Sequence, residues 1–198
     1  MKIIGITGGV GSGKSEVLNL LKQEYNAHII IADKVAHELM EPKAASYEAI
    51  VKEFGKEILK EDGTIDREIL GGIVFGDKEK LNVLNKITHK AVDCEIIERI
   101  HRIEETQKNP LIICEAALLV GAEYEHLFEQ LWYIYTKEEV RYERLRNSRG
   151  YTDEKISQMI KNQNSEEEFQ KAATHVIDNS GSIDDTRRQM EDILQKCK

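Results

Sequence analysis

The stretch "GGVGSGKS", residues 8–15, constrains the fold of this chain more than any other feature. It matches the pattern G-x-x-x-x-G-K-[ST], in which glycines let successive backbone N–H groups turn toward one anion. An apolar stretch, residues 2–7, precedes the pattern, and a leucine-rich stretch with helical spacing, residues 17–25, follows it. A strand, a glycine-rich loop and a helix in this order predict a phosphate-binding loop at the carboxyl end of a buried strand.

The motif also predicts what each residue does. Lys14 is expected to reach the outer phosphates of a nucleotide, and the Ser15 hydroxyl is placed to ligand Mg²⁺. The alternative dinucleotide pattern G-x-G-x-x-G is absent, because Lys14 stands where its third glycine belongs. We therefore expect nucleotide phosphates to bind the following residues: Gly8, Gly9, Val10, Gly11, Ser12, Gly13, Lys14, Ser15 and Glu16.

Composition narrows the class of protein. The 198 residues are 40% hydrophobic and 32% charged, as in a soluble globular protein, and the net charge of -8 gives no overall attraction to nucleic acid or to an anionic membrane. No apolar stretch has the length of a membrane-spanning helix, and the three cysteines fit neither a disulfide framework nor a zinc site. We expect a cytoplasmic monomer that binds neither nucleic acid nor a membrane.

Strands and helices alternate along much of the chain. Four further buried strands are predicted, over residues 27–33, 111–119, 131–136 and 174–179. This alternation predicts an α/β fold of the type found in P-loop nucleoside-triphosphate hydrolases, with a parallel five-stranded sheet and helices on both faces.

Two segments interrupt the alternation. Residues 34–109 are poor in strands and amphipathic, which predicts a helical insertion, with a helix beginning at Asp66 after the turn signal "EDGT". Residues 141–172 are helical in pattern, highly charged and broken at Gly150, which is typical of a lid. The core would then comprise residues 1–33, 110–140 and 173–198.

Two carboxylates are predicted to end strands at the same edge of the sheet as the phosphate loop. Asp33, after the second strand, could accept a proton from an acceptor hydroxyl; the alternative is that it caps the next helix. Glu115, after the third strand, could hold Mg²⁺ directly or through water; the alternative is a solvated charge.

Arginines follow the fourth strand. Arg141 and Arg144 can share one helix face, as can Arg146 and Arg149. Guanidinium groups suit a transferring phosphoryl group, whose charge is spread over several oxygens, although a solvated helix surface is the alternative.

Several motifs in one order resemble the dephospho-coenzyme A kinase family. The segments are "IGITGGVGSGKS", "ADKVAHELM", "FGKEILKEDGTIDREILGGIVF", "LNKITHKAV", "RYERLRNSRGYT" and "THVIDNSGS", and the resemblance covers residues 1–183. It implies ATP-dependent phosphorylation of the ribose 3'-hydroxyl of dephospho-coenzyme A, the last step of coenzyme A biosynthesis. It also implies that the helical insertion binds the acceptor.

The resemblance further implies roles for particular residues. Asp33, Lys14 and Arg144 would be catalytic, with Arg144 and Arg149 as lid arginines and Asn179 in the loop beside the adenine. The acceptor would lie against Thr7, Asp33, Ala36 and His89. This chain departs from the usual family residues at the following positions: Glu16, Lys90, Ala117, Val120, Gly121, Phe169 and Thr174.

Two other functions remain open at this point. A kinase of another small metabolite, such as a nucleoside or nucleotide, would share the same core. An ATP-dependent switch or binding module would hydrolyse ATP slowly and act through a partner.

Overall fold

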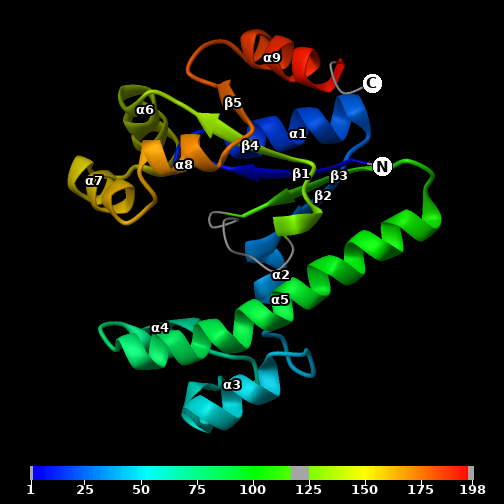
Figure 1. Ribbon diagram of the computed structural model, residues 1–198. Coiled ribbons are helices and arrows are strands. Elements are labelled where there is room, and N and C mark those ends of the chain that lie inside the picture. Colours follow the sequence, from blue (N-terminus) through cyan, green and yellow to red (C-terminus); the bar gives the residue numbers. More distant parts are fainter. Residues whose placement is uncertain (1, 117–124, 196–198) are drawn as a thin grey trace. The chain divides into compact units, whose positions relative to one another are not determined.

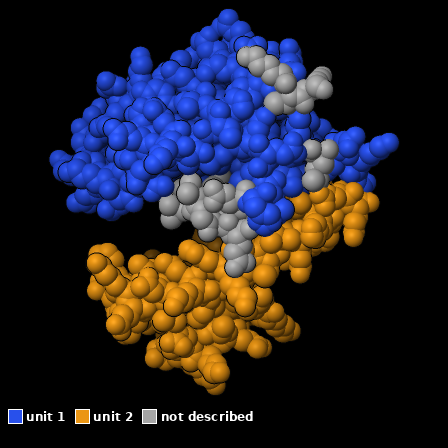
Figure 2. All heavy atoms as spheres, viewed as in Figure 1, with its two compact units in different colours: residues 1–30, 106–121, 125–198 blue, residues 31–105, 122–124 orange. Residues whose placement is uncertain are grey.

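The computed structural model describes residues 2–116 and 125–195 (Figure 1). Within them the chain forms two compact units (Figure 2). The first unit comprises residues 2–30, 106–116 and 125–195, and the second comprises residues 31–105. Each unit is described by itself below.

The chain forms one five-stranded sheet. Its strands are β1 (Lys2–Thr7), β2 (His28–Ile31), β3 (Leu111–Glu115), β4 (Gln130–Tyr135) and β5 (His175–Asp178), in the order β2-β3-β1-β4-β5. β1 lies parallel to β3 and β4, with Gly5 opposite both Cys114 and Leu131, and β4 lies parallel to β5. The predicted parallel five-stranded sheet is confirmed.

Apolar strands make the core of the first unit. Ile4, Ile6, Ile113 and Ile134 are fully buried, as expected for parallel strands covered on both faces. Trp132 is also fully buried, and its indole N–H donates to Gln130 Oε1 at 2.7 Å, so its ring is part of the core.

Helices α1 (Lys14–Tyr25) and α9 (Ile183–Gln195) lie side by side along the sheet (Figure 1). The two helices are linked by an ion pair between Arg187 Nε and Glu24 Oε1 at 3.0 Å. α1 begins directly after the glycine-rich loop, and α9 follows β5. These two neighbouring helices therefore come from opposite ends of the sequence.

Three helices form the charged segment that was expected to be a lid: α6 (Glu138–Arg149), α7 (Asp153–Lys161) and α8 (Glu166–Ala172). The predicted break at Gly150 is confirmed, since this residue ends α6 with a φ of 63°. Each of these helices has one buried apolar residue: Leu145 in α6, Ile156 in α7 and Phe169 in α8. The Phe169 ring stacks on Tyr133 of β4, with 5.0 Å between the ring centroids, which attaches α8 to the sheet.

The second unit is helical, as predicted for this part of the chain. It contains α2 (Ala32–Glu38), α3 (Tyr47–Phe54), the 3-10 turn η1 (Lys56–Ile58), α4 (Arg67–Val74) and nearly all of α5 (Lys78–Thr106). Asp66 caps α4 by accepting hydrogen bonds from the Glu68 and Ile69 N–H groups, as expected. The unit has its own hydrophobic cluster, which comprises Ile50, Phe54, Ile58, Ile65, Leu70 and Val74.

The second strand is shorter than predicted. β2 stops at Ile31, and Asp33 lies in the first turn of α2, whose N-cap is Ile31, so Asp33 neither ends the strand nor caps the helix. Alanine favours helix, and an aspartate in a first helical turn is stabilised by the positive end of the helix dipole, which explains the earlier start of α2. β3 also ends earlier than predicted, at Glu115 and not at residue 119, but it places the Glu115 carboxylate at the end of the strand, as expected.

No helix within residues 2–116 and 125–195 combines the length and the apolar character needed to cross a lipid bilayer.

Candidate functional site

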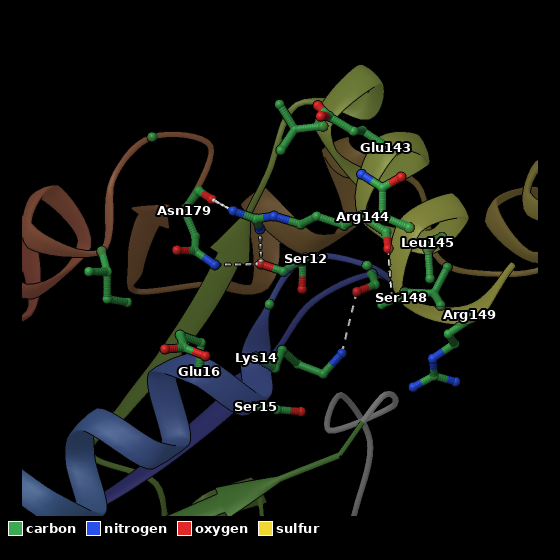
Figure 3. A pocket seen from close by; sticks show the side chains of 18 residues that line it. Ser12, Lys14, Ser15, Glu16, Glu143, Arg144, Leu145, Ser148, Arg149 and Asn179 are labelled. Atoms are coloured by element: carbon green, nitrogen blue, oxygen red, sulfur yellow. Dashed lines mark hydrogen bonds between the residues drawn. The ribbon is translucent and has the colours of Figure 1, made fainter.

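A pocket of about 840 Å³ lies against the glycine-rich loop of the first unit (Figure 3). Its walls come from the loop and first turn of α1, from α6 and from the segment between β5 and α9. Of the residues predicted to bind nucleotide, the lining includes Gly9, Val10, Gly11, Ser12, Gly13, Lys14, Ser15, Glu16, Arg144, Arg149 and Asn179.

Side chains pack directly onto two glycines of the loop. Gly13 has a φ of 81°, in the left-handed region, and a Cβ there would collide with the Asn179 amide. A Cβ on Gly9 would lie 2.5 Å from Arg141 Nη2. The left-handed backbone at Gly13 therefore favours glycine there, whereas a Cβ on Gly9 would require the Arg141 guanidinium to move away from the loop.

Lys14 is held within the loop. Its ammonium group donates to the carbonyl oxygens of Gly8 at 2.8 Å and Gly9 at 3.4 Å, and it lies 3.8 Å from Glu115 Oε1. The side chains of Lys14 and Glu115 are only 18% and 12% exposed, so their attraction is weakly screened. The structure thus places the carboxylate at the end of β3 beside the phosphate loop.

The Ser12 carbonyl oxygen joins three elements (Figure 3). It accepts hydrogen bonds from Thr136 Oγ1 at 2.9 Å, Asn179 Nδ2 at 2.8 Å and Arg144 Nη1 at 3.4 Å. Arg144 Nη2 also donates to the Asn179 carbonyl oxygen at 2.8 Å. These bonds fix the phosphate loop against α6 and the segment after β5.

Asn179 is the buried centre of this network. The residue is 3% exposed, and its Oδ1 accepts a hydrogen bond from the Thr186 hydroxyl of α9 at 2.8 Å. Its backbone N–H donates to the Tyr135 carbonyl oxygen at 2.8 Å. Asn179 therefore positions the pocket wall through both ends of its amide group.

The arginines of α6 divide into three kinds. Arg144 and Arg149 line the pocket, and a hydrogen bond from Arg149 lowers the pKa of the Tyr151 phenol. Arg146 instead pairs with both carboxylate oxygens of Asp153, at 2.6 and 2.7 Å. Arg141 Nε donates to the Val10 carbonyl oxygen at 2.8 Å, so this arginine holds the loop backbone.

The residues expected to face the acceptor lie in different places. Thr7 is the last residue of β1 and is buried. Asp33 and Ala36 lie one turn apart on α2, with Asp33 exposed and Ala36 half-buried, and His89 is exposed on α5. Asp33, Ala36 and His89 belong to the second unit, whereas Thr7 belongs to the first.

Sequence reasoning missed three polar residues of this network: Thr136 and Gln163, which bond the loop backbone, and Thr186, which bonds Asn179. Thr136 directly follows β4, and residues just after parallel strands are often found at binding sites, so its place in the chain was a usable signal. Gln163 meets Val10, and Thr186 meets Asn179, only once the chain has folded, and no motif or spacing in the sequence indicates either residue.

The departures from the usual family residues have simple structural roles where they are described. The Thr174 hydroxyl bonds to the Leu131 backbone at 2.9 and 3.0 Å, extending the end of the sheet, and Phe169 stacks on Tyr133. Glu16 is exposed in the first turn of α1, and Lys90 is exposed on α5. Ala117, Val120 and Gly121 lie outside the described residues.

No group of three or more His, Cys, Asp or Glu side chains that could hold a metal ion occurs in the described parts of the chain. Two oxygen groups near the loop that suit Mg²⁺ are the Ser15 hydroxyl, on the pocket wall, and the Glu115 carboxylate, beside Lys14. These two residues can supply part of a magnesium coordination shell, which in nucleotide sites is completed by phosphate oxygens and water.

Known proteins resemble the chain over its whole length. The model of the dephospho-CoA kinase family matches residues 2–185. A dephospho-CoA kinase of Carboxydothermus hydrogenoformans is 43% identical over 198 residues, which cover 100% of this chain and 95% of the relative.

Solved structures agree. A Thermus thermophilus protein superposes with a TM-score of 0.83 at 30% identity, covering 100% of this chain and 98% of the other. A dephospho-CoA kinase from Campylobacter jejuni superposes with a TM-score of 0.73 at 28% identity, with the same coverage. The family match extends from the phosphate loop through α6 to the segment that carries Asn179, and the chain belongs to the dephospho-CoA kinase family.

Proposed function

We propose that this protein transfers the γ-phosphoryl group of ATP to the ribose 3'-hydroxyl of dephospho-coenzyme A, giving coenzyme A and ADP. The observation that carries the proposal is the pocket formed on a complete phosphate loop, in a chain that matches the dephospho-CoA kinase family over residues 2–185.

ATP would occupy the pocket of the first unit. Backbone N–H groups at the N-terminus of α1 would supply donors for the phosphates, because the first N–H groups of a helix have no acceptor within it. The Val10 N–H is not among these donors, since it is bonded to Gln163. Lys14 would leave the Gly8 and Gly9 carbonyls for the outer phosphates, and Arg144 and Arg149 would neutralise charge on the transferring group. Asn179 would lie beside the adenine.

Mg²⁺ is the metal that this site would take. Ser15 would bind it through its hydroxyl, and Glu115 would bind it directly or through water, as the carboxylate after a strand does in many P-loop proteins. A bound Mg²⁺ would neutralise charge on the phosphates, while Ser15 and Glu115 would fix its position.

The second unit would bind the acceptor. Asp33 would take the proton of the 3'-hydroxyl as the oxygen attacks the γ-phosphorus, and the bond to the leaving ADP oxygen would break. Thr7, Ala36 and His89 would contact dephospho-coenzyme A. We further propose that α6, α7 and α8 close over bound ATP as a lid, since excluding water strengthens the electrostatic contacts with the phosphates.

We also propose that the enzyme acts as a cytoplasmic monomer. Its charge of -8 favours solubility and gives no general attraction to nucleic acid or anionic lipid.

The deciding experiment measures ADP release from ATP and Mg²⁺ with and without dephospho-coenzyme A, and follows the acceptor by mass spectrometry. The expected result is acceptor-dependent ADP release with a gain of one phosphate on dephospho-coenzyme A. Turnover with nucleosides or other small acceptors alone would replace the proposed substrate, and turnover that no small acceptor stimulates would favour a nucleotide-dependent switch.

A further inference from the structure

Both backbone polar groups of Val10 are bonded to side chains of the segment that contains α6, α7 and α8. The Val10 N–H donates to Gln163 Oε1 at 2.9 Å, and the Val10 carbonyl oxygen accepts from Arg141 Nε at 2.8 Å. Arg141 Nη2 in turn donates to the same Gln163 oxygen at 3.4 Å. Val10, Arg141 and Gln163 thus form a closed ring of three hydrogen bonds, here called the Val10 clamp.

The clamp connects segments that are remote in sequence. Gln163 lies in the turn between α7 and α8, and Arg141 lies in the first half of α6. The Arg141 guanidinium also covers Gly9, where any Cβ would collide with it. All three hydrogen bonds are partly buried, so water competes for them less than at an open surface.

The clamp acts at the outer part of the phosphate loop. Val10 follows Gly8 and Gly9, whose carbonyl oxygens accept from Lys14, and it lines the pocket. A glycine-rich backbone has many accessible conformations. If the loop became ordered only when ATP binds, the lost conformational entropy would weaken the affinity for ATP. A pair of side chains that fixes the loop beforehand removes part of this cost.

We propose that Gln163 is a positioning residue for ATP binding: with Arg141 it holds the Val10 peptide and couples the turn between α7 and α8 to the phosphate loop. This inference rests on the proposed ATP site, and it adds a residue that the loop motif does not contain. Gln163 acts through the backbone of Val10 and contacts no reacting atom.

The substitution Gln163→Ala removes the shared acceptor of the clamp. If the whole net free energy of one such hydrogen bond is lost from ATP binding, the ATP dissociation constant and the KM for ATP should rise about fivefold. The KM for dephospho-coenzyme A should change by less than about twofold, because all three residues of the clamp belong to the first unit and the acceptor is proposed to bind the second. Gln163→Glu keeps an oxygen acceptor for both donors and should recover most of the ATP affinity.

The test combines calorimetric ATP titration with hydrogen exchange of the Val10 amide, and neither readout needs an acceptor substrate. Exchange should accelerate in Gln163→Ala and stay close to the parent rate in the control Gln170→Ala, which changes an exposed glutamine of α8. If Gln163→Ala does not fold, Gln163→Asn serves instead, since it keeps the amide but is one methylene too short.

The outcomes separate the clamp from the proposed function. Unchanged Val10 exchange and unchanged ATP affinity in the Gln163 variant would overturn the clamp, as would an equal loss in Gln170→Ala. A parent protein that binds ATP but does not phosphorylate dephospho-coenzyme A would remove the proposed substrate, and the exchange and titration results would still decide the role of Gln163.

Discussion

Asp33 is the residue on which the proposed chemistry depends most. It lies exposed in the first turn of α2, in the second unit, while the residues that line the ATP pocket belong to the first unit. Because Asp33 and the pocket-lining residues belong to different units, we expect a change at Asp33 to slow the chemical step and to leave ATP binding unaltered.

The substitution Asp33→Asn should therefore lower kcat by about a hundredfold or more, because the amide cannot accept the hydroxyl proton. The ATP dissociation constant should stay within about twofold of the parent value. Steady-state kinetics and ATP titration measure the two quantities. Asp192→Asn, an exposed aspartate of α9, controls for the loss of one negative charge, and an unaltered kcat in Asp33→Asn would remove Asp33 from the role of base.

Asn179 has the opposite character, since its contacts are buried and structural. The substitution Asn179→Leu removes two hydrogen bonds of the side-chain amide, one to the Ser12 carbonyl oxygen and one from the Thr186 hydroxyl. It should lower the free energy of unfolding by about 2–4 kcal/mol. Thermal unfolding measures the change. Thr186→Val removes one bond of the same network and should cost less than Asn179→Leu, so an equal or greater cost would contradict the central place given to Asn179.

At the residue scale, a site can be predicted from the sequence where its residues are consecutive and form a short motif. Residues 9–15 are neighbours in sequence and all line the pocket, so their pattern indicates where it lies, while their role in binding a nucleotide stays a prediction. Gln163 is 153 positions from Val10, and Asn179 is 167 positions from Ser12. Such partners follow from the packing of distant elements, and local sequence does not record them. Arg141 shows the same limit, because spacing alone could not separate a phosphate ligand from a side chain that holds the loop.

At the scale of elements, strands were predicted well where apolar runs are bounded by clear breaks. β1 matches its prediction at both ends, while β2 is shorter because Ala32 and Asp33 enter a helix. The start of α4 was predictable, since Asp66 is a strong N-cap signal. The sheet order was not, because pairing between strands depends on contacts that no single segment encodes.

Charge pairs on α5 lead to a prediction about pH. Burial alone would raise the pKa of the Glu95 carboxyl, but hydrogen bonds from Arg99 at 2.7 Å and Arg102 at 2.9 Å lower it below its ordinary value. Arg99 also bonds Glu38 of α2 at 2.5 Å, so this network ties two helices of the second unit together. A carboxyl whose pKa is lowered in the folded state stabilises that state when ionised, and the stabilisation is lost as the pH falls through the folded-state pKa.

The substitution Glu95→Gln should lower the free energy of unfolding by about 1 kcal/mol at pH 7. The difference from the parent should shrink as the pH falls through and below 4.5, the ordinary pKa of this group, because both proteins then carry a neutral side chain. Urea unfolding at a series of pH values measures this. Glu98→Gln, at an exposed position on the same helix, should show no such pH-dependent gap, and a gap for Glu95→Gln that persists unchanged at acid pH would contradict the ionic origin.

At the scale of the whole molecule, two units with separate cores divide the work of the proposed reaction. The pocket is lined by residues of the first unit, whose core includes the fully buried Ile113 of β3. The second unit packs around its own cluster, in which Ile50 of α3 is also fully buried. Removing a buried methyl-rich side chain should then damage the unit that contains it first.

The substitution Ile50→Ala should cost the second unit about 3 kcal/mol and bring its unfolding to a lower temperature. Between that temperature and the unfolding of the first unit, the protein should still bind ATP but lose turnover with dephospho-coenzyme A. Ile113→Ala should instead weaken ATP binding, and Ile69→Ala, at a position that is 45% exposed in the second unit, should leave both properties nearly unchanged. ATP titration and turnover measured over the same temperatures decide the matter: if Ile50→Ala loses ATP binding and turnover together, the two units unfold as one and the division of roles between them cannot be read from their separate cores.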